Sequence, residues 1–447
     1  MASFQRRTVL TAVSTATVSA LAGCSGLLAD DSDDGDTSAA EDAAATFVET
    51  LADGEFEDAR EEFIPEMRDD IATLAQLEQA WMGYTAIGGE FEGVDSTAAD
   101  KQDGVYNVRI SMSFEHGSHD LLFAMNDEYE YGEYAPADEY ERPGYVDAAA
   151  ITDEEVTLET DDDECELSGL VTMPEDGDDV PGVVLVHDAG QVSMDSDTTA
   201  TKLFGDLAEG LASQGIATIR YDSRLAECDV DPDDHGIDTV AVDDALTAID
   251  ELRDADGVDS DEIVVVGHGF GGLAAPRIAD EDGDLAGIVG LAAPARPFYE
   301  VTLEQIEHQA TVGDHEWEAR MDQYEEWEAD VERIEDGDYD ADEPVCGYYG
   351  SLWESLEDYD HVETAASLEL PTYFLQGERD TRATVEDDLE RWESELEDTE
   401  SETAVYEDLN RAFMPGEGPA TPMEYDLRNN VDERVVDDIA TWVQDLY

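Results

Sequence analysis

The chain contains very little basic charge and almost no lysine. Of its 447 residues only Lys101 and Lys202 are lysines, and lysine and arginine together number 21 against 117 aspartates and glutamates. The formal net charge is therefore −96. Nucleic-acid binding depends on basic side chains that neutralise phosphate groups, so this composition excludes nucleic acid as a partner.

The acidic excess extends along the whole chain. A charge this large would push a compact state apart by self-repulsion unless salt screens it. At molar ionic strength the Debye length falls to roughly 3 Å, which makes such a charge tolerable. Apolar residues make up 41% of the chain, as in globular rather than acidic disordered proteins. We interpret the composition as the adaptation of a globular protein to strong brine.

Cysteine is scarce as well, and spacings typical of metal ligands are missing. Apart from one cysteine near the N-terminus, the chain has Cys165, Cys228 and Cys346, whose spacings match no metal site. Three thiols allow one disulfide in an exported protein, and the sequence does not choose the pair. His116 and His119 could ligate a metal, but they lie beside an expected turn and we expect them to be solvated. No metal and no organic cofactor is implied.

The N-terminal apolar run is too short and too polar to predict a membrane span. It extends from Val9 to Ala22, is rich in Thr, Ala and Val, and follows Arg6 and Arg7. A basic start, a short apolar stretch and small residues at its end indicate an export signal. The paired arginines favour the twin-arginine route.

Residues 21–24 read Leu-Ala-Gly-Cys, which resembles the processing box of lipoproteins, in which the cysteine is lipidated and becomes the new N-terminus. A chance cluster of small residues is the alternative. Residues 25–42 are dense in Asp, Ser, Gly and Ala and are expected to form a solvated acidic tether. We therefore expect residues 1–24 to be a lipoprotein signal and the mature chain to be anchored to the outer face of the cell membrane through Cys24.

Two folded domains are expected after the tether. Between residues 43 and 135 apolar residues first recur at helical spacing and then form two strands, which predicts a small α+β domain. From residue 150 to 447 strands and helices alternate, and continuous apolar runs such as Val183–Val186 are typical of strands buried on both faces. This order predicts an α/β fold with a doubly wound, mostly parallel sheet.

The most informative motif lies where the strand ending at Val266 turns into a helix. Residues 267–272 read Gly-His-Gly-Phe-Gly-Gly. In α/β-hydrolases this turn carries Gly-x-Ser-x-Gly, whose serine stands at the tip of a strained elbow. The glycine frame is present here, and Gly269 stands at the serine position.

With this motif, the second domain resembles the exported esterases and thioesterases of the α/β-hydrolase superfamily, in its dienelactone-hydrolase-like branch. The stretches that carry the resemblance are residues 185–190 (Leu-Val-His-Asp-Ala-Gly), 206–222, 375–380 (Leu-Gln-Gly-Glu-Arg-Asp) and 409–416 (Leu-Asn-Arg-Ala-Phe-Met-Pro-Gly). The small domain resembles a domain of unknown function that precedes hydrolase domains in some exported proteins. The resemblance implies that residues 297–344 form a helical cap, whose aromatic stripe we expect to pack onto the sheet.

The resemblance also implies a triad that has lost two of its three members. The nucleophile falls on Gly269, the acid on Asp380 and the general base on Arg411, while Asp188 replaces a glycine of the oxyanion-hole loop. Glycine has no side-chain oxygen, arginine stays protonated, and a carboxylate opposes a developing oxyanion. We therefore predict that no catalytic residue set is intact and that Asp380 and Arg411 form a partly buried structural pair.

Three functions stay open. A non-catalytic pseudohydrolase would bind a small acyl-type ligand or an envelope partner, and we favour this hypothesis. A hydrolase of esters, thioesters or peptides would need a relocated nucleophile, for which Ser193 with His187, His268 or His361 is the candidate, although each is also explained as a loop or core residue. A scaffold of the cell envelope would use the small domain as its working part.

Overall fold

The structure is a computed structural model that describes residues 37–160 and 165–446. The expected signal, Cys24 and most of the expected tether lie outside the described residues. Residues 38–42, which we expected to end the tether, belong to the first helix instead. Within the described ranges no helix is long and apolar enough to cross a membrane.

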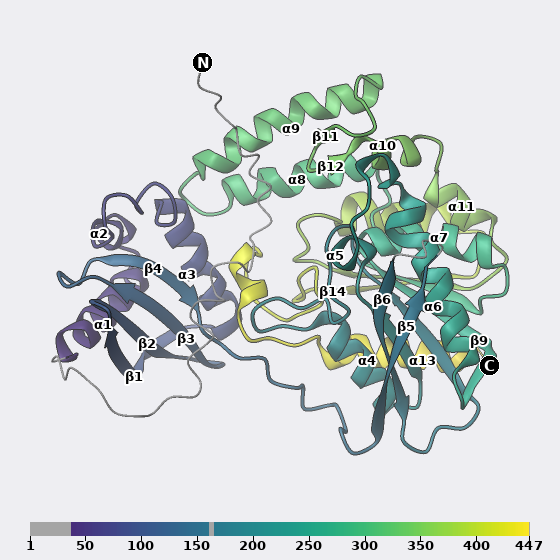
Figure 1. Ribbon diagram of the computed structural model, residues 1–447, viewed down its shortest axis with the longest axis horizontal. Coiled ribbons are helices and arrows are strands. Elements are labelled where there is room, and N and C mark those ends of the chain that lie inside the picture. Colours follow the sequence, from purple (N-terminus) through teal and green to yellow (C-terminus); the bar gives the residue numbers. More distant parts are fainter. Residues whose placement is uncertain (1–36, 161–164, 447) are drawn as a thin grey trace.

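The small domain packs three helices on a four-stranded antiparallel sheet, at the left of Figure 1. Its elements are α1 (Ser38–Ala52), α2 (Phe56–Glu61), α3 (Leu74–Gly88), β1 (Phe91–Gln102), β2 (Val105–Phe114), β3 (Gly117–Met125) and β4 (Tyr131–Pro136), and the strands pair in that order. Val108, Ile110 and Met112 of β2 are buried in one core with Phe47 of α1. Two strands were expected and four are present. Strand β1 was not expected because its residues are polar and mostly exposed.

Helix α3 connects the small domain to the rest of the molecule. It begins at a capping box formed by Thr73 and Gln76 and ends at Gly89, whose φ of 77° suits glycine. Most of its residues are buried, because a second surface covers the face turned away from the sheet. The Nε2 group of Gln79 donates to the main-chain oxygens of Gln309 and Val312 at 2.9 and 3.2 Å. Since both acceptors belong to the expected cap, α3 fixes the two domains to each other.

The second domain is an eight-stranded sheet with helices on both faces. Its strands are β5 (Ile151–Glu159), β6 (Glu166–Pro174), β7 (Val180–Val186), β8 (Ala217–Tyr221), β9 (Val258–His268), β10 (Gly287–Leu291), β13 (Thr372–Gly377) and β14 (Ser401–Tyr406), in the order β14-β13-β10-β9-β7-β8-β6-β5. Its helices are α4 (Leu203–Ser213), α5 (Arg224–Glu227), η2 (Pro232–Asp234), η3 (Asp238–Val242), α6 (Asp243–Asp254), α7 (Phe270–Asp282), η4 (Val385–Leu389), α12 (Glu390–Glu395), η5 (Pro422–Asp426) and α13 (Glu433–Asp445). Only the β5–β6 and β6–β8 pairings are antiparallel.

Alternate residues of β7 divide between two cores. Val183 and Leu185 pack with α4 and α13, whereas Val184 and Val186 pack with α6 and α7. The strand is therefore covered by helices on both faces, which explains its continuous apolar sequence. The predicted α/β-hydrolase architecture with a mostly parallel sheet is confirmed.

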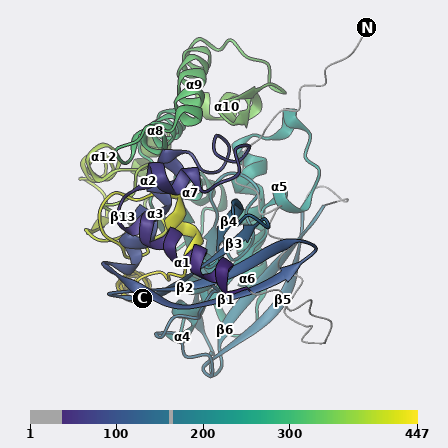
Figure 2. The ribbon, with the colours of Figure 1, turned by 90° about the vertical axis from the view of Figure 1, so that its left-hand side faces the viewer.

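An insertion between β10 and β13 forms a projecting helical layer. It contains α8 (Phe298–Thr311), α9 (Glu318–Asp336), β11 (Pro344–Val345), β12 (Tyr348–Tyr349), α10 (Gly350–Glu357) and α11 (His361–Ser367). Helix α9 lies on α8, and α8 separates it from the sheet (Figures 1 and 2). The expectation that the aromatic stripe of this segment packs onto the sheet is confirmed in part: Trp327 and Val331 are partly buried against the core on one face of the sheet, but α9 reaches that core through α8 and β11. None of the residues of α9 is fully buried, and Trp327 lies against the β11–β12 hairpin at Gly347.

One disulfide joins Cys165, at the start of β6, to Cys228, which follows α5. This structure selects the pair that the sequence left open. Cys346 is buried as a free thiol, and burial raises its pKa to about 12. A thiol with such a high pKa is a poor nucleophile, because the thiolate is the reactive form.

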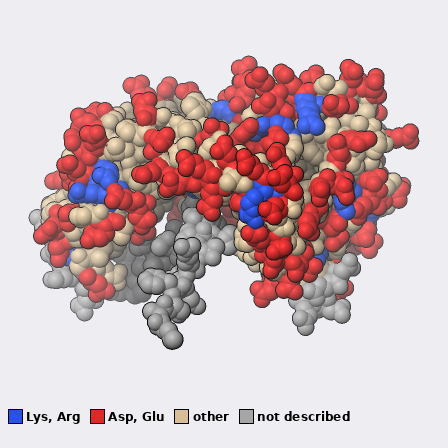
Figure 3. Space-filling view, turned by 90° about the horizontal axis from the view of Figure 1, so that it is seen from above, with Lys and Arg blue, Asp and Glu red and all other residues tan. Residues whose placement is uncertain are grey.

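The surface carries the acidic excess. Figure 3 shows aspartate and glutamate side chains over most of the face seen from above, with lysine and arginine only as isolated spots. This distribution matches a charge spread along the whole sequence, and it leaves no extended basic patch on the face shown.

Candidate functional site

The expected elbow joins β9 to α7 through Gly269. This residue has φ 57° and ψ −115°, a conformation that glycine adopts without strain. Its neighbours leave no room for side chains: a Cβ on Gly271 would lie 2.2 Å from the main-chain oxygen of Val186, and one on Gly267 would lie 2.2 Å from that of Gly271. The turn therefore has the tight backbone geometry of a nucleophile elbow, as the motif predicts.

Three loops bring the other expected residues to the elbow. Asp188 follows β7, Asp380 follows β13, and Arg411 lies in the loop after β14. These strands are parallel, so their carboxyl ends meet at one edge of the sheet. A Cβ built on Gly269 would lie 2.1 Å from Nη2 of Arg411 and 2.7 Å from Oδ2 of Asp188. Arg411 thus occupies the space that a serine side chain would need.

Arg411 is buried between two carboxylates. Its Nη2 donates to Oδ2 of Asp188 at 2.7 Å, and its Nη1 lies 3.5 Å from Oδ2 of Asp380. Burial alone would lower the pKa of the Arg411 guanidinium, but the two carboxylates outweigh it and raise that pKa above its usual value. The predicted Asp380–Arg411 contact is confirmed at a long hydrogen-bond distance, and Asp188 is the closer partner.

The carboxylate of Asp188 is the centre of the network. Its Oδ1 accepts hydrogen bonds from the N–H groups of Ala189 and Phe270, both at 2.9 Å. Its Oδ2 accepts from Arg411 at 2.7 Å and from Arg382 at 3.2 Å. Burial would raise the pKa of Asp188, but the charges of Arg411 and Arg382 lower it far below its ordinary value. Asp188 is therefore held in its ionised form at neutral pH.

This carboxylate stands in the place of an oxyanion. In α/β-hydrolases the oxyanion hole consists of the N–H of the residue after the nucleophile and an N–H from the loop after an earlier strand. Phe270 follows Gly269 and Ala189 lies in the loop after β7, so their N–H groups stand at the positions that correspond to these two. The sequence suggested that Asp188 opposes an oxyanion from beside the hole, whereas in the structure its own oxygen fills the hole. The sequence did not identify Arg382, although its position two residues after Asp380 placed it in the same loop.

Asp380 is fixed by neutral donors as well as by arginine. Its Oδ1 accepts from the main-chain N–H of Arg382 at 2.8 Å, and its Oδ2 accepts from Nε2 of the buried Gln376 at 3.0 Å. Burial raises the pKa of Asp380, and the charge of Arg411 only partly offsets this effect. The carboxyl group that would orient a catalytic histidine is therefore engaged in holding its own loop.

The residues considered for a relocated active site do not assemble into one. The hydroxyl of Ser193 hydrogen-bonds to Asp197. The ring nitrogens of His187 and His268 bond to the main-chain oxygens of Asp188 and Arg411 at 2.9 and 3.0 Å. Burial is the main cause of the low pKa of both rings. It lowers the pKa of His268 to about 4 and also lowers the pKa of His187.

His361 and His119 are both buried. His361 packs edge-on against Trp392, and burial lowers its pKa to about 4. His119 was expected to be solvated, and this expectation is wrong. Its side chain is buried, and its Nδ1 lies 2.5 Å from Oδ2 of the buried Asp138. The polar sequence around the turn concealed this burial, which depends on a partner nineteen residues away. No group of metal-binding side chains occurs in the described residues.

Two cavities of very different size are relevant to ligand binding, and only the smaller one is lined by residues of the elbow network. The relic pocket, of about 70 Å³, is lined by Arg382 and Arg411 together with Gln305 and Gln309 of α8. The domain groove, of about 720 Å³, lies between α3, the start of β1 and the loop at residues 417–418.

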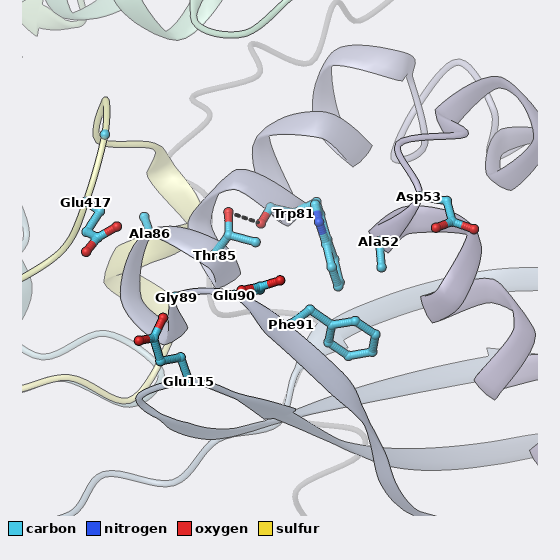
Figure 4. A pocket seen from close by; sticks show the side chains of 11 residues that line it. Ala52, Asp53, Trp81, Thr85, Ala86, Gly89, Glu90, Phe91, Glu115 and Glu417 are labelled. Atoms are coloured by element: carbon cyan, nitrogen blue, oxygen red, sulfur yellow. Dashed lines mark hydrogen bonds between the residues drawn. The ribbon is translucent and has the colours of Figure 1, made fainter.

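The domain groove has aromatic and acidic walls. Figure 4 shows Trp81 and Phe91 on one side of the groove and Glu115 and Glu417 on the other. The rings of Trp81 and Phe91 pack edge to face, with their centroids 5.4 Å apart. The N–H of Glu417 donates to the main-chain oxygen of Ala86 at 2.8 Å, so the hydrolase-domain loop is held against α3 at this point. The groove is therefore a joint feature of both domains.

Known proteins match both parts of the chain. Residues 183–420 match the model of the alpha/beta hydrolase family, and residues 44–131 match that of a protein domain of unknown function, DUF3887. Esterase EstD of Thermotoga maritima is 30% identical over 405 residues, which are 90% of this chain and 94% of that protein.

Solved structures resemble the hydrolase part more distantly. An esterase of Pyrobaculum calidifontis shares 18% identity, with a TM-score of 0.44 over 66% of this chain and 85% of that one. Brefeldin A esterase, a bacterial homologue of human hormone-sensitive lipase, shares 18% identity, with a TM-score of 0.43 over 69% and 80% of the two chains.

Proposed function

The chain belongs to the α/β-hydrolase family, and we propose that it is a member that has lost serine-hydrolase turnover and acts outside the cell by binding a ligand or partner. The observation that carries this proposal is Gly269 at the tip of the elbow, with Arg411 packed where a side chain would stand. In a comparable triad, loss of the serine or the histidine alone lowers kcat on the order of a million-fold. Both positions differ here.

Two further features support the loss of turnover. Arg411 stays protonated at any relevant pH and cannot take a proton from a nucleophile. The N–H groups of Ala189 and Phe270 already donate to Asp188, so they are not free to stabilise a tetrahedral intermediate. A serine placed at position 269 would therefore still lack both a base and an oxyanion hole.

The sizes of the two cavities indicate where a ligand would bind. Sites for small organic ligands usually enclose about 300–1,000 Å³. The relic pocket, at about 70 Å³, is too small for an ester of ordinary size, whereas the domain groove reaches about 720 Å³. We place the ligand in the groove, where an apolar part such as a short acyl chain would pack on Trp81 and Phe91.

Export and anchoring belong to the same proposal and rest on the N-terminal sequence around Arg6, Arg7 and Cys24. The disulfide between Cys165 and Cys228 supports it, because disulfides persist in oxidising compartments outside the cytosol. We expect Cys24→Ala to release the exported chain from the membrane fraction into the medium. Retention of the variant on membranes would contradict a lipid anchor at Cys24.

An active hydrolase with a rearranged site is the second candidate. The observation that favours it is the 30% identity to a protein named as an esterase over 90% of this chain. Such an enzyme needs a nucleophile with a nearby base, and Ser193 is the residue that the sequence suggests. In the structure the hydroxyl of Ser193 bonds to Asp197 rather than to a histidine.

Hydrolysis of short acyl esters and thioesters in molar salt distinguishes the two candidates. We expect the wild-type rate to equal that of buffer, and Ser193→Ala and His268→Gln to change nothing. Turnover by the wild type that one of these substitutions abolishes would establish the second candidate and overturn the first. The matched comparison excludes contaminating esterases, because a contaminant's activity would be the same in all three preparations.

A further inference from the structure

The oxyanion hole of this chain is complete and occupied. Two main-chain N–H groups and two guanidinium groups direct hydrogen bonds of 2.7–3.2 Å at the two oxygens of one carboxylate, that of Asp188. Charge-assisted bonds of this kind are the strong ones, and proteins use them to recognise carboxylates. We infer that the former oxyanion hole is a carboxylate receptor whose ligand is the chain's own Asp188.

Part of this receptor is held by contacts that do not involve Asp188: Nη1 of Arg411 also lies 3.5 Å from the main-chain oxygen of Ala292 and from Oδ2 of Asp380. The N–H of Phe270 is fixed by the elbow, which the contacts of Gly267 and Gly271 hold tightly. Arg382 and Arg411 come from the loops after β13 and β14, and their side chains are 12% and 9% exposed. Removal of Asp188 would leave two buried guanidinium groups and two N–H groups without the carboxylate that they share, and a carboxylate from solution is the partner that replaces it.

The inference rests on the proposed loss of turnover, because a hole used in catalysis cannot be permanently filled. Its consequence for the wild-type chain is that esters and free carboxylates are excluded from the hole by an internal competitor. The competitor also defines the size of the ligand. Asp188→Gly removes a CH₂–COO⁻ group, which has the dimensions of acetate, and Asp188→Ala removes the carboxylate alone, which has those of formate.

Acetate binding to the full chain tests the receptor. Sodium acetate replaces part of the sodium chloride at constant molar ionic strength, and both the Tm and the line width of ¹³C-labelled acetate are followed. We expect acetate at a hundredfold its Kd to raise the Tm of Asp188→Gly by roughly 5 °C. The wild type and Asp188→Asn, which keeps the size of the side chain without its charge, should show no acetate-specific shift. Propionate, one methylene longer, should raise the Tm of Asp188→Gly less than acetate does.

The other outcomes contradict the inference. An equal effect of acetate on the wild type and on Asp188→Gly would place the binding elsewhere. Absence of any acetate-specific response in Asp188→Gly would show that the donors do not form a receptor. If Asp188→Gly does not fold, Asp188→Ala with formate carries the same test. Turnover of esters by the wild type would refute the proposed function, whereas failure of acetate to bind the variant refutes the receptor alone.

Discussion

The elbow backbone matches the pattern of the α/β-hydrolase family, whereas the side chains around it do not. Gly267 and Gly271 provide the close approach of β9, α7 and β7, with main-chain atoms where a Cβ would stand. Asp188, Gly269 and Arg411 replace the groups that would perform acyl transfer. The glycine contacts are needed for the packing of the sheet and its helices whether or not the site turns over. The fold is therefore weak evidence for catalysis, and the side chains decide.

The comparison also shows what fills the site. A buried network of two carboxylates and two guanidinium groups stands where a serine, a histidine and a substrate oxyanion would stand. Each guanidinium group in this network faces at least one carboxyl group, so no buried cation is without a partner as long as every member is present. Removal of one member should then be costly, because it leaves a buried charge without a partner.

The largest expected effect comes from Arg411→Met. We expect a loss of about 4 kcal/mol in the free energy of unfolding, because Asp188 and Asp380 lose their shared cation. Arg434→Met is the matched control: Arg434 pairs with Asp408 at 2.8 Å, but its side chain is 52% exposed, and such surface pairs contribute about 1 kcal/mol or less. Urea unfolding in molar salt measures both losses. Equal losses would show that the buried network does not stabilise the site.

A second test separates the elbow frame from its tip. We expect Gly271→Ala to lower the free energy of unfolding by about 3 kcal/mol, because the new Cβ meets the main-chain oxygen of Val186, which cannot move away. Gly269→Ala should cost about 2 kcal/mol, for its positive φ and for the displacement of the Arg411 and Asp188 side-chain ends, which can move although the main chain cannot. A larger loss for Gly269→Ala than for Gly271→Ala would reverse the account of which part is rigid.

A third test uses the pH dependence of His268, which directly precedes Gly269 in the elbow. Burial is the first cause that lowers its pKa to about 4, and the charge of Arg411 adds to it. A histidine in the unfolded chain has a pKa of about 6.5. Between about pH 6.5 and about pH 4 the unfolded chain therefore binds a proton at His268 that the folded chain does not bind. The contribution of His268 to the free energy of unfolding is therefore fully present above about pH 6.5. It falls by up to about 3 kcal/mol as the pH is lowered toward about 4. His268→Gln should flatten that slope in urea titrations, and an unchanged slope would contradict the burial argument.

The sequence predicted those parts of the fold that depend on local pattern. Continuous apolar runs identified β7 and β9, and the glycine frame identified the elbow. Strand β1 was missed because its residues are polar and mostly exposed, so that only its pairing with β2 defines it. The packing of α9 on α8 was also missed, because an amphipathic spacing does not specify which surface it covers.

The candidate site was predicted only in part, because some of its contacts join residues that are far apart in the chain. The resemblance of their motifs to those of α/β-hydrolases predicted the positions of Gly269, Asp380 and Arg411, and the structure brings the three residues together. The position of the Asp188 carboxylate could not be derived, because it depends on Arg382 and Arg411, about two hundred residues away in the chain. The burial of His119 likewise depends on a partner that the local pattern does not reveal, Asp138, nineteen residues away.

The most direct test of the central claim is a restored enzyme. The triple change Asp188→Gly, Gly269→Ser and Arg411→His empties the oxyanion hole, supplies a nucleophile and places a base beside Asp380. Hydrolysis of short acyl esters in molar salt is measured for this variant, for Gly269→Ser alone and for the wild type. The account predicts that only the triple variant exceeds the buffer rate. Turnover by the wild type that the triple change leaves unaltered would show that the chemistry lies elsewhere in the chain and would contradict the account.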